Sequence, residues 1–299
     1  MRLRALACGA VMALAFSSPA WAADAAPESS TLRQRPITIG EELTIASKAL
    51  GEDRRIAVYL PADYAEGSKR YPVLYLIDGG VDQDFLHIAG TTQLNAIWGR
   101  SEPVIVVGIE TVNRQSELTG PTHAPDLLKT YPKAGHSADF RRFIRDEVMP
   151  LIATRYRGNG QQGVIGESLA ALFIVETALR EPGLFQRYAA ISPSLWWDDE
   201  SLPKAASGLL GKASPAIYLD IADEGGAMDQ GYDQVVKALA TNAPMGAHWC
   251  AVKHPALAHS TIYHAVSPQA LQFLFPVEGK PVEGQEMPRE CTATEKAAG

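Results

Sequence analysis

Basic residues are outnumbered by acidic residues in this sequence. Its 299 residues include 27 Lys and Arg against 34 Asp and Glu, which gives a formal net charge of −7. A nucleic acid or an anionic membrane surface is held by an excess of positive charge, so the composition argues against both as partners. Hydrophobic residues make up 46% of the chain, enough for one sizeable core.

Motifs for metal and phosphate binding are also missing. No cluster of histidines and acidic residues has the spacing of a zinc site, and no glycine-rich loop has the pattern that cradles a phosphate. We therefore expect the protein to work without a metal or an organic cofactor.

Cysteine is scarce, at three residues. Cys8 lies in an N-terminal apolar run, so Cys250 and Cys291 are the two available to a folded domain. In an oxidising compartment they could form a disulfide that ties a polar C-terminal tail to the body of the fold. The alternative is one buried thiol and one exposed thiol, and the sequence leaves both open.

The N-terminus has the organisation of a secretory signal peptide. A basic start, MRLR, precedes the apolar run ALACGAVMALAF and a small-residue cleavage site at Ala20-Trp21-Ala22. The run is too short for a membrane span, and no other segment of the sequence could cross a bilayer. We expect residues 1–22 to be removed, leaving a periplasmic or secreted protein with no membrane insertion.

The rest of the chain reads as one α/β domain. Residues 23–36 are small and polar and are expected to be disordered, and residues 277–299 read as a polar tail. Between them, two early strand-like runs lead into a strand–helix series, and the runs VLYLID and VIVVGIE are apolar on both faces, as buried parallel strands are. This order predicts a doubly wound, mostly parallel sheet with helices on both faces over residues 37–276. The expected strands are 37–46, 55–60, 72–77, 104–109, 162–165, 187–191, 216–222 and 248–253, and the expected helices are 84–97, 138–154, 169–180, 199–209, 229–241 and 261–274.

Ser168 is the candidate nucleophile. It follows the strand-like run QQGVIG and precedes the helical pattern LAALFIVETAL, where a strand would turn sharply into a helix. Such a turn exposes the serine and requires small residues two positions before and after it, here Gly166 and Ala170. Because Ala170 replaces the usual second glycine, the motif alone is weak. The alternative is an ordinary serine at the start of a buried helix.

A nucleophilic serine needs a base, an acid that orients the base, and donors for an oxyanion. In this fold class the order along the chain is serine, acid, histidine. The candidate acids after the strand IYLDIA are Asp223, Glu224 and Asp229. Among the histidines, His259 is favoured over His254 and His264 because it lies in the loop before the last helix and is free to reach the serine.

Two further stretches should lie beside the serine. The run IDGG ends at Gly80, where a backbone N–H can approach a substrate carbonyl oxygen, and the N–H of Leu169 is the second expected oxyanion donor. The alternative is a plain glycine turn. The stretch SPSLWW follows a later strand, and its Trp196 and Trp197 either pack in the core or form a flat wall for an aromatic or acyl group.

The motifs YPVLYLIDGG, VIVVGIE, IGESLAALF, AAISPSLWW and HSTIYH occur in this order over residues 37–275. Together they resemble the putative-esterase branch of the α/β-hydrolase superfamily, which includes periplasmic enterobactin and salmochelin (siderophore) esterases. The resemblance implies an α/β-hydrolase fold and a set of roles: Ser168 as nucleophile, His259 as base, Glu224 as acid, and Gly80 and Leu169 as oxyanion donors. Some siderophore esterases are thought to use a serine–histidine dyad.

The sequence therefore favours an exported serine hydrolase that cleaves carboxylic esters of small molecules through an acyl-enzyme. An acyltransferase would use the same machinery, with an alcohol or amine in place of water, and a catalytically inactive ligand-binding module is a third hypothesis. The loop RQSELTGP, within a long break at residues 111–137, is altered from an arginine-rich form in the family, and its Arg114 is the candidate basic contact for a substrate.

Overall fold

The computed structural model describes residues 33–210, 216–243 and 247–277. The chain divides into two compact units, residues 1–37 and 38–299. Of the first unit, residues 33–37 are described, and they form neither helix nor strand. The expected signal peptide, residues 23–32 of the lead-in, residues 278–299 of the tail and Cys291 lie outside the described residues.

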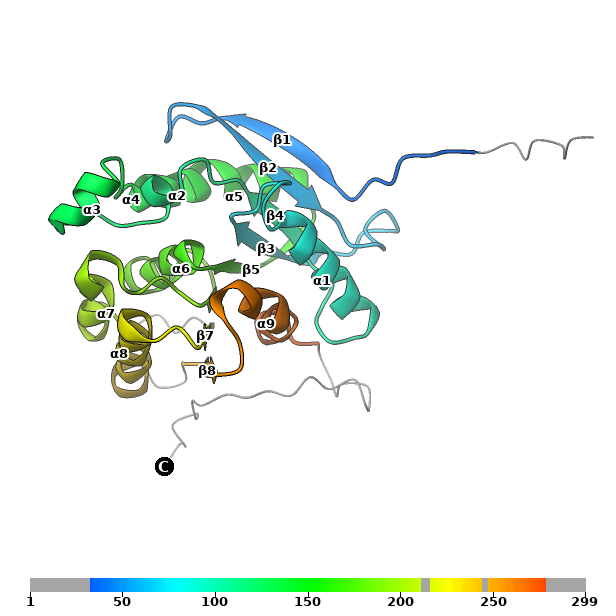
Figure 1. Ribbon diagram of the computed structural model, residues 1–299. Helices are drawn as coiled ribbons and strands as arrows, with labels where there is room; N and C mark the ends of the chain where they lie inside the picture. Colours follow the sequence, from blue (N-terminus) through cyan, green and yellow to red (C-terminus); the bar gives the residue numbers. More distant parts are fainter. Residues whose placement is uncertain (1–32, 211–215, 244–246, 278–299) are drawn as a thin grey trace, which may run out of the picture. The chain divides into compact units, whose positions relative to one another are not determined.

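The second unit is built on an eight-stranded sheet with the order β1-β2-β4-β3-β5-β6-β7-β8 (Figure 1). β2 pairs antiparallel with both β1 and β4, and the remaining neighbours are parallel. The mostly parallel α/β fold predicted from the sequence is confirmed. The strands are β1 (Glu41–Ala46), β2 (Asp53–Tyr59), β3 (Tyr71–Ile77), β4 (Ile105–Ile109), β5 (Gly158–Glu167), β6 (Arg187–Ile191), β7 (Ala216–Ala222) and β8 (Trp249–His254).

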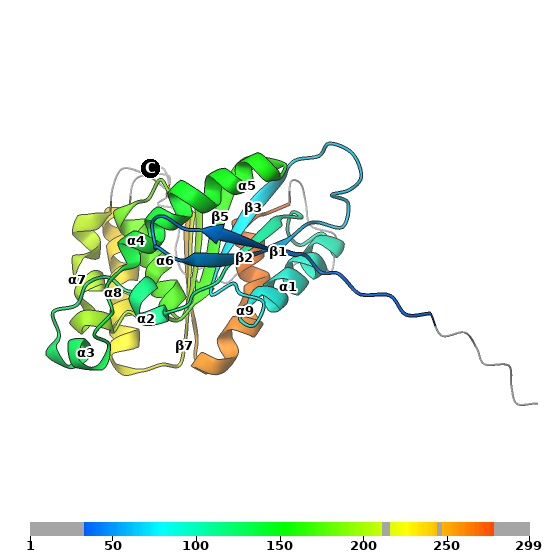
Figure 2. The same ribbon diagram turned by 90° about the horizontal axis from the view of Figure 1, so that it is seen from above.

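Two hydrophobic cores lie on the two faces of this sheet. Along β3, Tyr75 and Ile77 belong to one core and Leu74 and Leu76 to the other, and all four are at most 1% exposed. A strand buried on both faces needs apolar residues at every position, which explains the unbroken run in the sequence. Figure 2 shows α1 and α9 on one side of the sheet and α5, α6, α7 and α8 on the other. The helices are α1 (Phe85–Ile97), α2 (Arg114–Glu117), α3 (Pro125–Thr130), α4 (Ser137–Phe143), α5 (Met149–Arg155), α6 (Leu169–Arg180), α7 (Trp197–Leu209), α8 (Gly226–Asn242) and α9 (His259–Leu274).

The first strand begins at Glu41 and not at residue 37, and the last helix begins at His259, which was expected in the loop before it. Two further segments differ in kind from the expectation. The helix predicted over 138–154 is divided into α4 and α5 by a π-helical turn, Ile144–Val148. Pro150 follows this turn, has no N–H to donate to the preceding turn and so prevents a regular α-helix there. The long break at 111–137 is not structureless, because it contains the short helices α2 and α3.

The residues that follow the parallel strands all lie at one edge of the sheet. β5, β6, β7 and β8 run in the same direction, so the loops after their carboxyl ends meet. Within the described ranges, no helix has the length and apolarity needed to cross a membrane.

Candidate active site

Ser168 occupies the sharp turn between β5 and α6. Its backbone angles, φ 61° and ψ −118°, lie in a region that non-glycine residues rarely adopt and that costs on the order of 1–3 kcal/mol. A Cβ atom added to Gly166 would lie 2.7 Å from the Cβ of Ala170. Strand and helix therefore approach so closely that only one of these two positions can carry a methyl group.

A chain of hydrogen bonds connects Ser168 to an acid through a histidine. The Oγ of Ser168 lies 3.0 Å from Nε2 of His259, and Nδ1 of His259 lies 2.6 Å from Oε1 of Glu224. Glu224 follows β7 and His259 is the first residue of α9, so the parallel sheet brings both beside the end of β5. The imidazole of His259 is 42% exposed, and the Glu224 side chain is mostly buried.

The other two candidate histidines are bound elsewhere. Nε2 of His254 lies 3.2 Å from Oδ2 of Asp220, a fully buried residue of β7. Nδ1 of His264 lies 3.2 Å from Nε2 of His87, on α1. Of the three candidate histidines, His259 is the one that the structure brings to the serine.

Two serines of the stretch SPSLWW, for which the sequence predicted no role, belong to the same site. The Oγ of Ser192 donates to Oε1 of Glu224 at 2.6 Å and accepts the N–H of Ala222 at 3.2 Å. The Oγ of Ser194 lies 3.2 Å from the Oγ of Ser168. The sequence places both serines directly after β6, and the residues that follow parallel strands gather at this edge of the sheet. Their position in the sequence could therefore have indicated a place in the site.

The two expected oxyanion donors are placed differently. Leu169 is the first residue of α6, directly after the serine. The N–H of Gly80 donates to Oε1 of Gln83 at 2.9 Å, and Nε2 of Gln83 donates to the carbonyl of Thr111 at 2.9 Å. Gly80 can therefore serve as an oxyanion donor only when the Gln83 side chain releases it.

A cleft of about 300 Å³ opens beside Ser168 and His259. Its aromatic wall contains Trp196, Trp197 and Tyr131, with ring centroids 5.8 Å apart for the two tryptophans and 6.1 Å apart for Tyr131 and Trp197. Nε1 of Trp197 donates to the carbonyl of Gly120 at 3.1 Å, which holds the wall against the long 111–136 segment.

Arg114 is the basic residue of the cleft lining. Its Nε and Nη2 each lie 2.8 Å from Oδ2 of Asp78, so the carboxylate offsets part of its charge. A buried ion pair fixes the segment that carries Arg114. In this pair, Nη2 and Nη1 of Arg54 donate to the two carboxylate oxygens of Glu117 at 2.8 and 3.0 Å.

Two acidic groups near the site have raised pKa values. Burial raises the pKa of Glu167, the residue before the serine, to about 7, and the charge of His259 opposes this shift. Burial and the neighbouring charge of Asp78 raise the pKa of Asp84 to about 6. Both groups therefore add little negative charge to the site in mildly acidic solution.

Comparison with known proteins finds relatives of the chain. The family described as "Putative esterase" matches residues 47–249, more than half of the chain. Among curated proteins, the ferri-bacillibactin esterase BesA of Bacillus subtilis (strain 168) is 32% identical over 148 residues, which cover 43% of this chain and 49% of that protein. The chain thus matches about half the length of this relative.

Solved structures share the fold over most of the chain. An IroE-like serine hydrolase from Shewanella oneidensis has a TM-score of 0.70 at 27% identity, covering 79% of this chain and 80% of the other. The BES protein from Bacillus cereus has a TM-score of 0.72 at 21% identity and covers 83% of this chain and 100% of its own; this likeness concerns the fold alone. These neighbours have the α/β-hydrolase architecture that the sequence predicts.

Proposed function

The chain belongs to the putative esterase family, and on this premise we propose that it is an exported serine hydrolase that cleaves carboxylic esters through an acyl-enzyme on Ser168. The observation that carries the proposal is the continuous hydrogen-bonded chain from Ser168 through His259 to Glu224. A serine, a base within hydrogen-bond reach and a group that orients the base are the parts that nucleophilic catalysis requires.

In the acylation step, Nε2 of His259 takes the proton of Ser168 as Oγ attacks the ester carbonyl. The carbonyl oxygen becomes an oxyanion, stabilised by the N–H of Leu169 and by the N–H of Gly80 once Gln83 has moved. The imidazolium then gives its proton to the departing alcohol, and the acyl group remains bound to Oγ.

In the deacylation step, a water molecule takes the place of the alcohol. His259 removes its proton, the resulting hydroxide attacks the acyl group, and the acid leaves as Ser168 regains its proton. Glu224 accepts a hydrogen bond from Nδ1–H, which leaves Nε2 unprotonated and able to act as the base. The hydroxyl of Ser192 donates to the same oxygen of Glu224 and keeps the carboxylate oriented toward the ring.

For the substrate, we propose a siderophore-type ester with an aromatic acyl group. The relative from Bacillus subtilis is named a ferri-bacillibactin esterase, and a fungal relative, from Emericella nidulans, is named a siderophore enterobactin esterase. The aromatic wall of Trp196 and Trp197 offers a flat apolar surface to such a group, and Arg114 offers a positive charge at the cleft.

For the location, we propose the periplasm or the exterior of the cell, on the strength of the N-terminal signal-peptide pattern. The disulfide between Cys250 and Cys291 remains a prediction. Cys250 is fully buried in β8, and Cys291 is outside the described residues.

The decisive test is Ser168→Ala. We expect the variant to lose hydrolysis of chromogenic aryl esters by a factor of about 10⁴–10⁶ and to lose covalent labelling by a fluorophosphonate, with an unchanged circular dichroism spectrum. Ser201→Ala, a change outside the hydrogen-bonded chain, is the matched control and should keep full activity. Activity of Ser168→Ala within a factor of about ten of the parent would refute the nucleophile. Product analysis with an added alcohol separates hydrolysis from acyl transfer.

A further inference from the structure

Two atoms of Ser194 contact the nucleophile. Its backbone N–H donates to the carbonyl of Ser168 at 3.1 Å, and its Oγ lies 3.2 Å from the Oγ of Ser168. Ser194 follows β6, is 3% exposed and belongs to the lining of the catalytic cleft. Among the described residues, Ser168 is the one hydrogen-bond partner of the Ser194 hydroxyl. The acylation and deacylation steps above make no use of this hydroxyl.

The protons of the site decide which serine is the donor in this contact. Glu224 accepts the hydrogen bond from Nδ1–H of His259, so Nε2 of the ring carries no proton. Nε2 therefore accepts the one proton of the Ser168 hydroxyl, which lies 3.0 Å away. Because Ser168 then has no proton left to donate, the hydroxyl of Ser194 is the donor and the Oγ of Ser168 is the acceptor.

The strength of this hydrogen bond changes during the reaction. At 3.2 Å it is longer than a strong O–H···O hydrogen bond, so it holds the neutral hydroxyl of Ser168 weakly. When His259 takes the proton, negative charge develops on the Oγ of Ser168, and a hydrogen bond to a charged oxygen is shorter and roughly twice as strong. An interaction that is stronger in the transition state than in the ground state raises kcat.

The same oxygen gains charge twice in each turnover. In acylation, Nε2 of His259 takes the proton of Ser168 while the bond between Oγ and the acyl carbon forms. In deacylation that bond breaks, its electron pair stays on Oγ, and the imidazolium returns the proton. Ser194 keeps its own proton in both steps, so it assists them by hydrogen bonding alone.

We propose that Ser194 is a further catalytic residue, whose hydroxyl stabilises the charge that develops on the Oγ of Ser168. It acts on the nucleophile, whereas the N–H groups of the oxyanion site act on the carbonyl oxygen of the substrate. The inference rests on the proposed esterase mechanism.

Ser194→Ala tests the proposal with aryl esters and a fluorophosphonate. A hydrogen bond to a charged group corresponds to a change of about 10–100-fold, so kcat should fall by that factor. KM should change little, because both steps slow and the hydroxyl does not hold the substrate. The rate constant for covalent labelling should fall by a similar factor, because labelling needs the same attack by Ser168. Ser194→Thr keeps the hydroxyl and should recover most of the lost rate.

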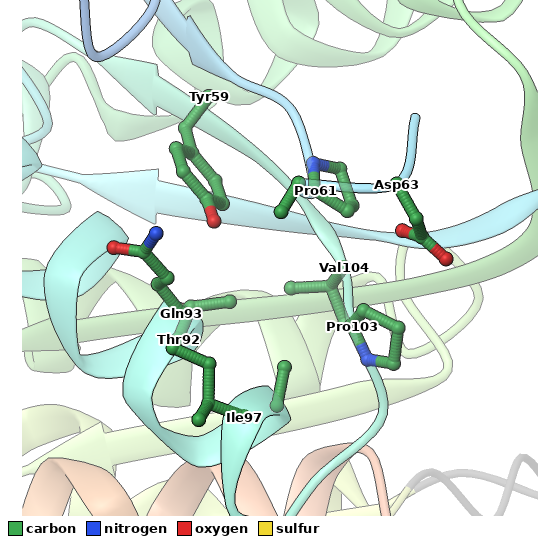
Figure 3. Close-up of a pocket in the computed structure, with 10 residues that line it drawn as sticks. Tyr59, Pro61, Asp63, Thr92, Gln93, Ile97, Pro103 and Val104 are labelled. Atoms are coloured by element: carbon green, nitrogen blue, oxygen red, sulfur yellow. The ribbon is translucent and has the colours of Figure 1, made fainter. Parts of the chain in front are cut away.

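Thr92→Val is the matched control, because it removes a hydroxyl that is as buried as that of Ser194. Thr92 is 1% exposed, and its Oγ1 has no hydrogen-bond partner among the described residues. It borders a separate cavity of about 210 Å³ beside α1 (Figure 3). Tyr59, in the same lining, pairs with Val106 near the start of β4, whereas Ser168 follows the carboxyl end of β5, so this cavity lies at the other edge of the sheet. The control should keep the kcat, KM and labelling rate of the unmodified protein.

The outcomes separate this inference from the esterase proposal. An unmodified protein that neither hydrolyses esters nor reacts with the fluorophosphonate would overturn both, because Ser168 would not be a nucleophile. If the unmodified protein is active and Ser168→Ala is not, a Ser194→Ala variant with unchanged kcat and labelling rate overturns the role of Ser194 alone. So does a folded Ser194→Thr variant that is no faster than Ser194→Ala, or an equal loss in Thr92→Val.

Discussion

Among single side chains, Glu224 has the most specific surroundings in the site. One of its oxygens accepts two hydrogen bonds of 2.6 Å, from His259 and from Ser192. These two donors hold the carboxylate in one position beside the imidazole ring. Neither Asp223 nor Asp229 has a hydrogen bond to the histidine among the described residues, although the sequence alone could not choose among the three.

Loss of the base should lower kcat more than loss of the acid. We expect His259→Ala to lower kcat by about 10⁴–10⁶, as loss of a triad member does. Glu224→Gln should lower it by about 10²–10⁴, because the acid orients the ring and stabilises the imidazolium without taking the proton itself. Values of kcat/KM for the parent and the two variants provide the measurement. A fully active Glu224→Gln enzyme would indicate a dyad.

Glu167 should make stability depend on pH. Burial raises its pKa from 4.5 to about 7, so between these values the folded protein retains a proton that the unfolded chain releases. Its contribution is therefore most favourable below pH 4.5 and is lost as the pH rises through 7. Glu167→Gln removes this dependence: its melting temperature, relative to the parent, should rise from pH 4.5 to 7 and then level off. Glu66→Gln, at an exposed carboxylate, is the control, and an equal pH trend in both variants would contradict the assignment.

At the scale of elements, the junction of β5 and α6 is the tightest constraint on the site. The family signature has glycine on both sides of the nucleophile, and this chain has Gly166 and Ala170. Ala170 is fully buried, and the space that a second methyl group would need at Gly166 is already filled by its Cβ. The alanine is tolerated because the glycine on the strand leaves room for it.

A pair of substitutions tests this reciprocity. Gly166→Ala should destabilise the protein by about 1–3 kcal/mol through overpacking, and Ala170→Gly should be nearly neutral for activity. The double variant, which exchanges the two residues, should recover much of the loss, because the closest contact disappears. Urea denaturation of the four proteins gives the coupling energy. Additive effects would mean that the two positions do not meet.

Over the whole molecule, the sequence predicted the layers well because the sheet is buried on both faces. Residues 73–77 of the run VLYLID carry no charge that would obscure the strand. Because the strands are parallel, the serine, acid and histidine that follow them meet at one edge of the sheet. Contacts that depend on three dimensions were not predictable. The hydrogen bond from Gly80 to Gln83, the support of Glu224 by Ser192 and the π-helical turn before Pro150 each depend on where side chains or carbonyls lie after folding.

The pair of Arg54 and Glu117 links the sheet to the long segment over the site. The Arg54 side chain is fully buried, so Glu117→Gln should cost about 3 kcal/mol of folding stability, because it leaves that charge with the half-exposed Glu52 carboxylate as its one remaining acidic partner among the described residues. The segment 111–118 should also exchange its amide hydrogens faster, and KM should rise as Arg114 loses its fixed position. Glu52→Gln removes the exposed partner of the same arginine and should cost little. Unchanged exchange in 111–118 would show that the pair does not hold this segment.

The exposure of the His259 ring bears on what becomes of an acyl group on Ser168. Because 42% of the imidazole is open to solvent, a water molecule can reach this base directly from bulk solvent and act as the second nucleophile. An enzyme that transfers acyl groups has to keep the intermediate alive until a rare acceptor arrives, which requires a dry approach to the histidine. For the acyl-enzyme that we propose, this exposure therefore favours release of the free acid over passage of the acyl group to another alcohol.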